Sequence, residues 1–147
     1  MSGLDDESRT ALVEYRLERA YATMEEAAVM TEKEFYNAAV NRLYYACYYA
    51  TEALLLKHKI EAKSHAGVKS MLGLHFVSKG LVPISIGKIL STLYEKRQSG
   101  DYDDFIYCDK EMTDDLTIQA ETYIDCLAKL VRDNILLETN DLDKNNK

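Results

Sequence analysis

The stretch LYYACYYATEALLL, residues 43–56, constrains the fold most, because it is apolar or aromatic on nearly every side of a helix. Such a helix is buried by several neighbouring helices or by another subunit. At about 14 residues, with Glu52 inside it, the stretch is too short to span a bilayer. One Pro and six Gly in 147 residues are too few turn residues for a β-sandwich or barrel. We therefore predict an all-α, up-and-down bundle of about five helices.

Apolar periodicity and capping residues place those helices along the chain. The first should run from a cap at Asp5 or Asp6 to about residue 30, and the second from Thr31 to about residue 57. Thr31 and Glu34 have the spacing of a capping box, which favours a helix start there. Ser64 can cap a third helix over residues 65–77, because a serine side chain at the N-cap accepts a hydrogen bond from a free backbone amide of the first turn.

Glycine and proline mark the turns in the second half of the chain. Gly80 and Pro83 bracket a turn before a fourth helix, which should reach Arg97 and stop at Gly100. Thr113 should open a fifth helix to about residue 137. We expect residues 1–138 to form a single helical domain and the polar residues 139–147 to be a disordered tail.

The formal net charge of −7 argues against duplex DNA as the main ligand, because such binding requires clustered Lys and Arg. The charge is uneven: residues 101–115 hold seven acids against Lys110, a local net of −6. This segment is either a solvated loop or a surface for a basic partner or a metal. Phe105 and Ile106 occupy positions that exclude a calcium-binding loop. The three widely spaced cysteines and the absence of a signal peptide favour a reducing cytoplasm.

Arg42 is the most informative charged residue of the second helix, because Tyr45 and Tyr49 share its face. An arginine in this position requires a carboxylate or a ligand phosphate. Both alternatives stay open: an internal ion pair, with Asp101 or with an acid of another helix, or a ligand site.

His65 and Arg97 are the other candidates for a ligand groove. His65 opens a helix after a basic stretch, so a phosphate-binding corner is conceivable there. Arg97 lies on the apolar face of its helix and has Asp101 near it in sequence. The histidines lack the i, i+4 spacing of a helical zinc site, so we predict no metal and no cofactor.

Three motifs together resemble one family. Residues 41–46 read NRLYYA, residues 63–68 read KSHAGV and residues 97–102 read RQSGDY, in this order on successive predicted helices. This arrangement is similar to the small stand-alone HEPN domains (higher eukaryotes and prokaryotes nucleotide-binding), over roughly residues 8–135. The resemblance implies a helical bundle, usually a homodimer, with a nucleotide or RNA as ligand.

Many members of that family are metal-independent ribonucleases with an R-x(4–6)-H motif. Counting from Arg97, the positions four to six residues on are Asp101, Tyr102 and Asp103, so the histidine is absent. The sequence therefore identifies no catalytic residue and favours a protein that is not an enzyme of this kind.

The resemblance also implies a partner. Such domains are commonly encoded beside a minimal nucleotidyltransferase as a toxin–antitoxin pair, and the transferase can attach AMP to a tyrosine near the motif. Tyr102 is the matching candidate. The main hypothesis is thus a component of such a pair, with a groove formed by Arg42, Tyr45, His65, Arg97, Asp101 and Tyr102. The alternatives are a ribonuclease that uses Arg97, Asp101 and His65, and a non-catalytic interaction module.

Overall fold

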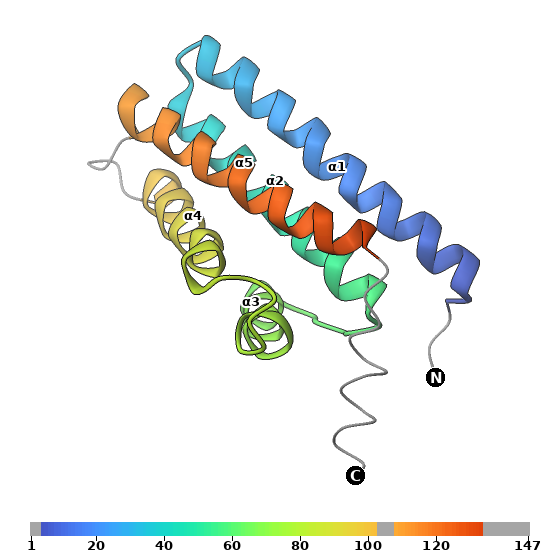
Figure 1. The fold of residues 1–147 in the computed structure, drawn as a ribbon. Coiled ribbons are helices and arrows are strands. Elements are labelled where there is room, and N and C mark those ends of the chain that lie inside the picture. The colour runs from blue at the N-terminus through green and yellow to red at the C-terminus, as the bar shows by residue number, and fades with distance from the viewer. Residues whose placement is uncertain (1–3, 103–107, 134–147) are drawn as a thin grey trace.

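The computed structural model describes residues 4–102 and 108–133, and within them the side chains of all but residues 98–102. In these ranges the chain forms five α-helices and one π-helical turn, without a strand (Figure 1). The elements are α1 (Asp6–Glu32), α2 (Tyr36–Lys57), α3 (His65–Leu72), η1 (Gly73–Val77), α4 (Ile84–Tyr102) and α5 (Lys110–Arg132). The predicted all-α class and the number of helices are confirmed.

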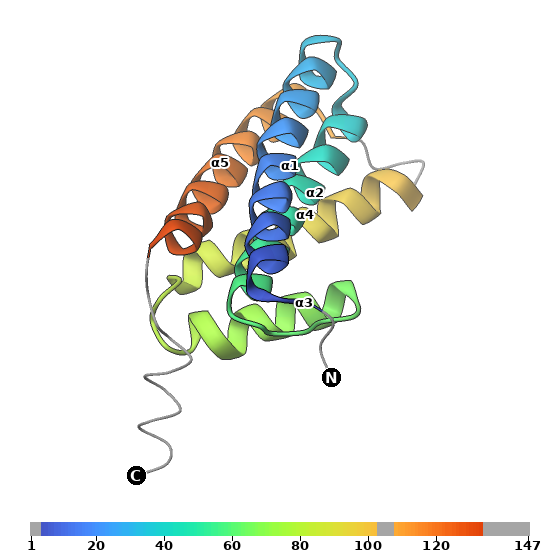
Figure 2. The ribbon, with the colours of Figure 1, turned by 90° about the vertical axis from the view of Figure 1, so that its right-hand side faces the viewer.

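Helix α2 is the centre of the bundle. The helices α1, α2 and α5 lie side by side, α4 crosses them obliquely, and α3 lies across one end (Figures 1 and 2). Helix α2 packs against α1, α5, α4 and α3. Its buried residues include Leu43, Tyr44, Cys47 and Leu54, which lie on more than one side of the helix. Burial by several neighbours thus explains the apolar stretch at residues 43–56.

A polar pair lies within this apolar core, between α2 and α5. The hydroxyls of Thr51 and Tyr123 are 2.6 Å apart, and both residues are fully buried. Thr51 donates its own proton to the carbonyl of Cys47 at 2.7 Å. Tyr123 is therefore the donor to Thr51, and burial raises the pKa of Tyr123 so that it keeps this proton.

The predicted start of the second helix at Thr31 is wrong, because α1 continues through Thr31 to Glu32. The Thr31 hydroxyl donates to the carbonyl of Ala27 within α1 and caps nothing. Glu34 has a positive φ of 65°. The amides of Glu34 and Phe35 donate to the carbonyls of Thr31 and Met30. This is a Schellman motif, which ends α1 with Glu34 at the position that glycine usually occupies.

Three further predictions concern helix ends: the N-terminal caps at Asp5 and Ser64 and the stop at Gly100. The caps at Asp5 and Ser64 are confirmed, since their side chains accept from the amides of Ser8 and Gly67 at 2.7 and 2.9 Å. Helix α4 runs through Gly100 to Tyr102, so the predicted stop at Gly100 is wrong. An isolated glycine lowers helix stability without necessarily ending the helix.

Helix α5 starts three residues before the predicted cap at Thr113, at Lys110. Asp109 is the cap, and its carboxylate accepts from the Met112 amide at 2.8 Å. Residues 103–107, the predicted helix end near residue 137 and the predicted tail at 139–147 fall outside the described residues. Among the helices that the structure does describe, none is long and apolar enough to cross a membrane.

Candidate functional site

Aromatic and basic side chains from three helices meet beside the middle of α2. We call this group the arginine–tyrosine cluster. It consists of Arg42, Tyr44, Tyr45 and Tyr48 from α2, His65 from α3, and Tyr94 and Arg97 from α4. The i, i+3 and i, i+4 spacing on α2 stacks its tyrosines along one face, and α3 and α4 bring their residues to that face.

The ring of Tyr45 joins three of the sequence-predicted residues. The guanidinium carbons of Arg42 and Arg97 each lie 5.4 Å from the centroid of this ring. The ring of His65 lies edge-on to it, with the centroids 6.0 Å apart. Arg97 also donates to the Tyr45 hydroxyl at 3.4 Å. Such cation–π contacts hold both guanidinium groups at the Tyr45 ring without neutralising their charge.

Arg42 has an ion-pair partner on α1, which the sequence did not identify. Its guanidinium lies 3.3 Å from the carboxylate of Glu26 and donates to the Asn41 side chain at 3.0 Å. Arg19 also approaches Glu26, at 3.9 Å. Glu26 is thus shared between two arginines, and these side chains are partly exposed, so the pairs are weak in energy.

His65 is held by two aromatic rings and one hydrogen bond. Its Nδ1 atom lies 2.5 Å from the hydroxyl of Tyr44. Its ring stacks on Tyr48 at a centroid distance of 4.4 Å and on Tyr44 at 5.6 Å. Burial and, to a lesser degree, the nearby charge of Arg97 lower the pKa of His65. The imidazole is therefore neutral at pH 7.

Of the six predicted groove residues, the structure brings Arg42, Tyr45, His65 and Arg97 together. Asp101 and Tyr102 belong to the last turn of α4, and their side chains lie outside the described part of the chain. Sequence reasoning missed Glu26, for which no local pattern existed, and did not include Tyr44 among the groove residues. Tyr44 is only 2% exposed, but its hydroxyl reaches His65. Within residues 4–102 and 108–133, no group of three His, Cys, Asp or Glu side chains could hold a metal.

Comparison with protein families decides what this bundle is. Residues 13–131 match the model of the HEPN domain. The chain belongs to the HEPN family. The match includes all of α2, α3 and α4 and most of α1 and α5, and the whole arginine–tyrosine cluster lies within it.

Relatives of this chain come from bacteria and archaea. The chain is 33% identical over 122 residues to a "UPF0332 protein" of Thermotoga maritima, which covers 83% of this chain and 92% of that protein. It is 32% identical over 133 residues to "Putative toxin MJ0142" of Methanocaldococcus jannaschii, with 90% of each chain covered. A second protein of that archaeon, "Putative toxin MJ0605", is 32% identical over 117 residues, 80% of this chain and 87% of that one.

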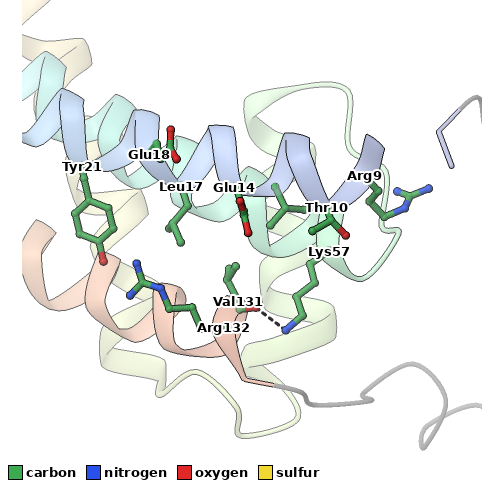
Figure 3. Close-up of a pocket in the computed structure, with 10 residues that line it drawn as sticks. Arg9, Thr10, Glu14, Leu17, Glu18, Tyr21, Lys57, Val131 and Arg132 are labelled. Carbon is green, nitrogen blue, oxygen red and sulfur yellow. Dashed lines mark hydrogen bonds between the residues drawn. The ribbon is translucent and has the colours of Figure 1, made fainter. Parts of the chain in front are cut away.

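This HEPN domain also has a groove of about 590 Å³ between α1 and α5, near the end of α2. Figure 3 shows that Tyr21 of α1 and Arg132 of α5 point toward one another across it, with the guanidinium 5.8 Å from the ring centroid. Lys57 donates to the carbonyls of Leu130 and Val131, so its ammonium group binds the end of α5. Of the sequence-predicted site residues whose side chains the structure describes, none lines this groove.

Proposed function

We propose that this HEPN protein is one component of a toxin–antitoxin-like pair whose other component is a minimal nucleotidyltransferase. The names of the two relatives from Methanocaldococcus jannaschii support the toxin–antitoxin assignment. The partner is inferred from the family resemblance that the three motifs carry together, and Tyr102, in the residue 97–102 motif, is the candidate for modification with AMP.

In this proposal the arginine–tyrosine cluster binds the phosphate of a nucleotide or of RNA. The observation that carries it is the placement of Arg42 and Arg97 at equal distance from one Tyr45 ring. Guanidinium groups bind phosphate oxygens in a bidentate manner, and tyrosine rings stack on bases. Arg19 and Arg42 share the one carboxylate of Glu26, so a phosphate at this face would meet two guanidinium groups that have a single acidic partner between them.

The ligand half of the proposal is tested by titrating the purified protein with AMP in a calorimeter. We expect Arg97→Gln to weaken binding about tenfold or more, since a hydrogen bond to a charged group is lost. Lys88→Gln is the matched control, because it removes one positive charge from the exposed side of the same helix, α4. Equal loss in both variants would mean that only net charge matters and would contradict a built site.

The partner half is tested by purifying the tagged protein from its native host and analysing the eluate by mass spectrometry. We expect a nucleotidyltransferase in the eluate and an AMP adduct on Tyr102. Tyr102→Phe should abolish the adduct, whereas Tyr15→Phe, on the exposed side of α1, should retain it. An unmodified protein without a nucleotidyltransferase would count against the two-component assignment.

We also propose a homodimer, as the family resemblance implies. The apolar character of α2, which suggested another subunit, is already accounted for by α1, α3, α4 and α5 of the same chain. The proposal therefore depends on the resemblance alone. Sedimentation equilibrium at micromolar concentration tests it, and a mass of 16.8 kDa, that of one chain, would contradict it.

A ribonuclease is the second candidate, because His65 and Arg97 come together although they are far apart in sequence. The guanidinium carbon of Arg97 lies 5.5 Å from the centroid of the Tyr44 ring, whose hydroxyl reaches His65. The arrangement supplies a histidine near an arginine without the R-x(4–6)-H motif. Cleavage of single-stranded RNA by the protein, abolished in Arg97→Gln and retained in Lys88→Gln, would support this candidate.

A further inference from the structure

The contact between Tyr44 and His65 defines the chemistry that the histidine offers. Tyr44 is 2% exposed, so its hydroxyl requires a partner inside the protein. That partner is His65 Nδ1, at 2.5 Å. The hydrogen bond has two possible directions, because either atom could carry the proton. The direction determines which nitrogen of His65 carries the hydrogen.

Physical chemistry selects one direction. Burial raises the pKa of Tyr44 above its ordinary value, so the phenol keeps its proton. His65 is neutral at pH 7, because its pKa is lowered, and a neutral imidazole has one N–H and one nitrogen lone pair. A phenol is the better donor of the two groups and an imidazole nitrogen is the better acceptor. Tyr44 therefore donates to Nδ1, and the ring hydrogen is on Nε2.

We propose that Tyr44 is a positioning residue that holds His65 in the neutral tautomer with the hydrogen on Nε2. The ring stacks of Tyr48 and Tyr44 on His65 resist rotation of the imidazole. Ser64, as the cap of α3, sets the position of the backbone that carries it. The histidine then presents a hydrogen-bond donor on a partly exposed ring, near the charge of Arg97.

This tautomer has a consequence for the function. A donor at Nε2 binds an anionic oxygen, as the arginines of the cluster do. It cannot accept a proton from an attacking hydroxyl through the same nitrogen, so His65 does not act there as a general base. The inference thus favours ligand binding over the ribonuclease candidate. The use of the donor by a phosphate depends on the proposed function, whereas the tautomer itself does not.

The tautomer is tested directly by nitrogen-15 NMR of the histidine side chains at pH 7.5. The chain has three histidines, and the signals of His65 are assigned from their loss in His65→Gln. We expect a protonated Nε2 and an unprotonated, hydrogen-bonded Nδ1 in the unmodified protein. A hydrogen on Nδ1, or a doubly protonated ring, would overturn the proposal, and the only variant that this measurement needs is His65→Gln for the assignment.

Two variants separate the hydroxyl from the ring. Tyr44→Phe should shift the Nδ1 signal toward that of a free nitrogen and populate both tautomers. Tyr48→Phe keeps its ring on the imidazole and removes a hydroxyl that is not the one bonded to Nδ1, so the Nε2–H tautomer should persist. Loss of the tautomer preference in Tyr48→Phe with retention in Tyr44→Phe would contradict the role of Tyr44.

The AMP titration links the tautomer to the site. We expect Tyr44→Phe to weaken AMP binding about fivefold to tenfold, the effect of one hydrogen bond, and Tyr15→Phe to leave it unchanged. Unchanged affinity in Tyr44→Phe would overturn its positioning role for the ligand. If the unmodified protein does not bind AMP, the proposed ligand is wrong, and the NMR result still decides the tautomer.

Discussion

Arg97 near the end of the described part of α4 lies over the ring of Tyr45 in the middle of α2, 5.4 Å from its centroid, and donates to its hydroxyl at 3.4 Å. The same ring lies under Arg42. Two positive groups are thus oriented by one tyrosine before any ligand arrives, which lowers the entropic cost of binding one.

This relationship predicts the effect of changing Tyr45. Tyr45→Leu should lower the free energy of unfolding by about 1–2 kcal/mol, since the ring and its cation–π contacts are lost. Tyr45→Phe keeps the ring and loses only one long hydrogen bond, so its effect should stay below about 0.5 kcal/mol. Urea denaturation of both variants checks the prediction. Equal losses would mean that the hydroxyl, rather than the ring, makes the important contact.

Replacing the residues that end α1 and α2, Glu34 and Lys59, by glycine should stabilise the protein. Both residues have positive φ, 65° and 60°. At the second end, the amides of Lys59 and Ile60 donate to the carbonyls of Leu56 and Leu55, as in the first Schellman motif. Glycine adopts this conformation without steric cost. Glu34→Gly and Lys59→Gly should each raise the free energy of unfolding by about 0.5–1 kcal/mol.

Thermal and urea denaturation measure that gain, and the two effects should add, because the sites lie at opposite ends of α2. Lys33→Gly is the control, since Lys33 has an ordinary negative φ of −87°. It should destabilise the protein, because glycine there only adds freedom to the unfolded chain. A gain in Lys33→Gly comparable to that in Glu34→Gly would argue against the backbone explanation.

Removing either hydroxyl of the buried pair Thr51 and Tyr123 should lower the free energy of unfolding, but by unequal amounts. Tyr123→Phe removes the donor and should cost about 1–1.5 kcal/mol, because Thr51 still donates to the carbonyl of Cys47. Thr51→Val should cost about 2–3 kcal/mol, since it leaves both the buried Tyr123 hydroxyl and that carbonyl without this partner. The double variant should cost less than the sum. An additive double-mutant cycle would mean that the two hydroxyls are not coupled.

His58 predicts how stability depends on pH. It is 4% exposed at the end of α2, and burial, with smaller contributions from Lys57 and His75, lowers its pKa from 6.5 to about 4. Between these two values the unfolded chain binds more protons than the folded protein. Stability should therefore fall as the pH decreases from 6.5 toward 4, by up to about 3 kcal/mol from this residue.

Urea denaturation at a series of pH values measures this fall. His58→Gln, which does not titrate, should show a smaller slope between pH 6.5 and 4.5. Part of the slope should remain, because the pKa of His65 is lowered in the same direction. Identical slopes in the variant and the unmodified protein would show that His58 does not contribute.

Several features of this protein could be predicted from local sequence alone. The number of helices, the burial of α2 and the caps at Asp5 and Ser64 depend on periodicity and on hydrogen bonds between residues three or four apart. The turn at Gly80 belongs with them, since its φ of 76° is one that glycine adopts readily. The three family motifs also belong to single helices or to their ends.

The tertiary structure decided two things: the end of α1 at Glu34, where no glycine marks it, and the side chains that meet between helices. The capping-box spacing of Thr31 and Glu34 favoured a helix start at Thr31, but the backbone hydrogen bonds of the Schellman motif end a helix there. The pairing of Arg42 with Glu26 and of Tyr44 with His65 joins residues on different helices. Such contacts depend on how the helices cross, and crossing is set by packing of the whole core, which no local pattern in the sequence encodes.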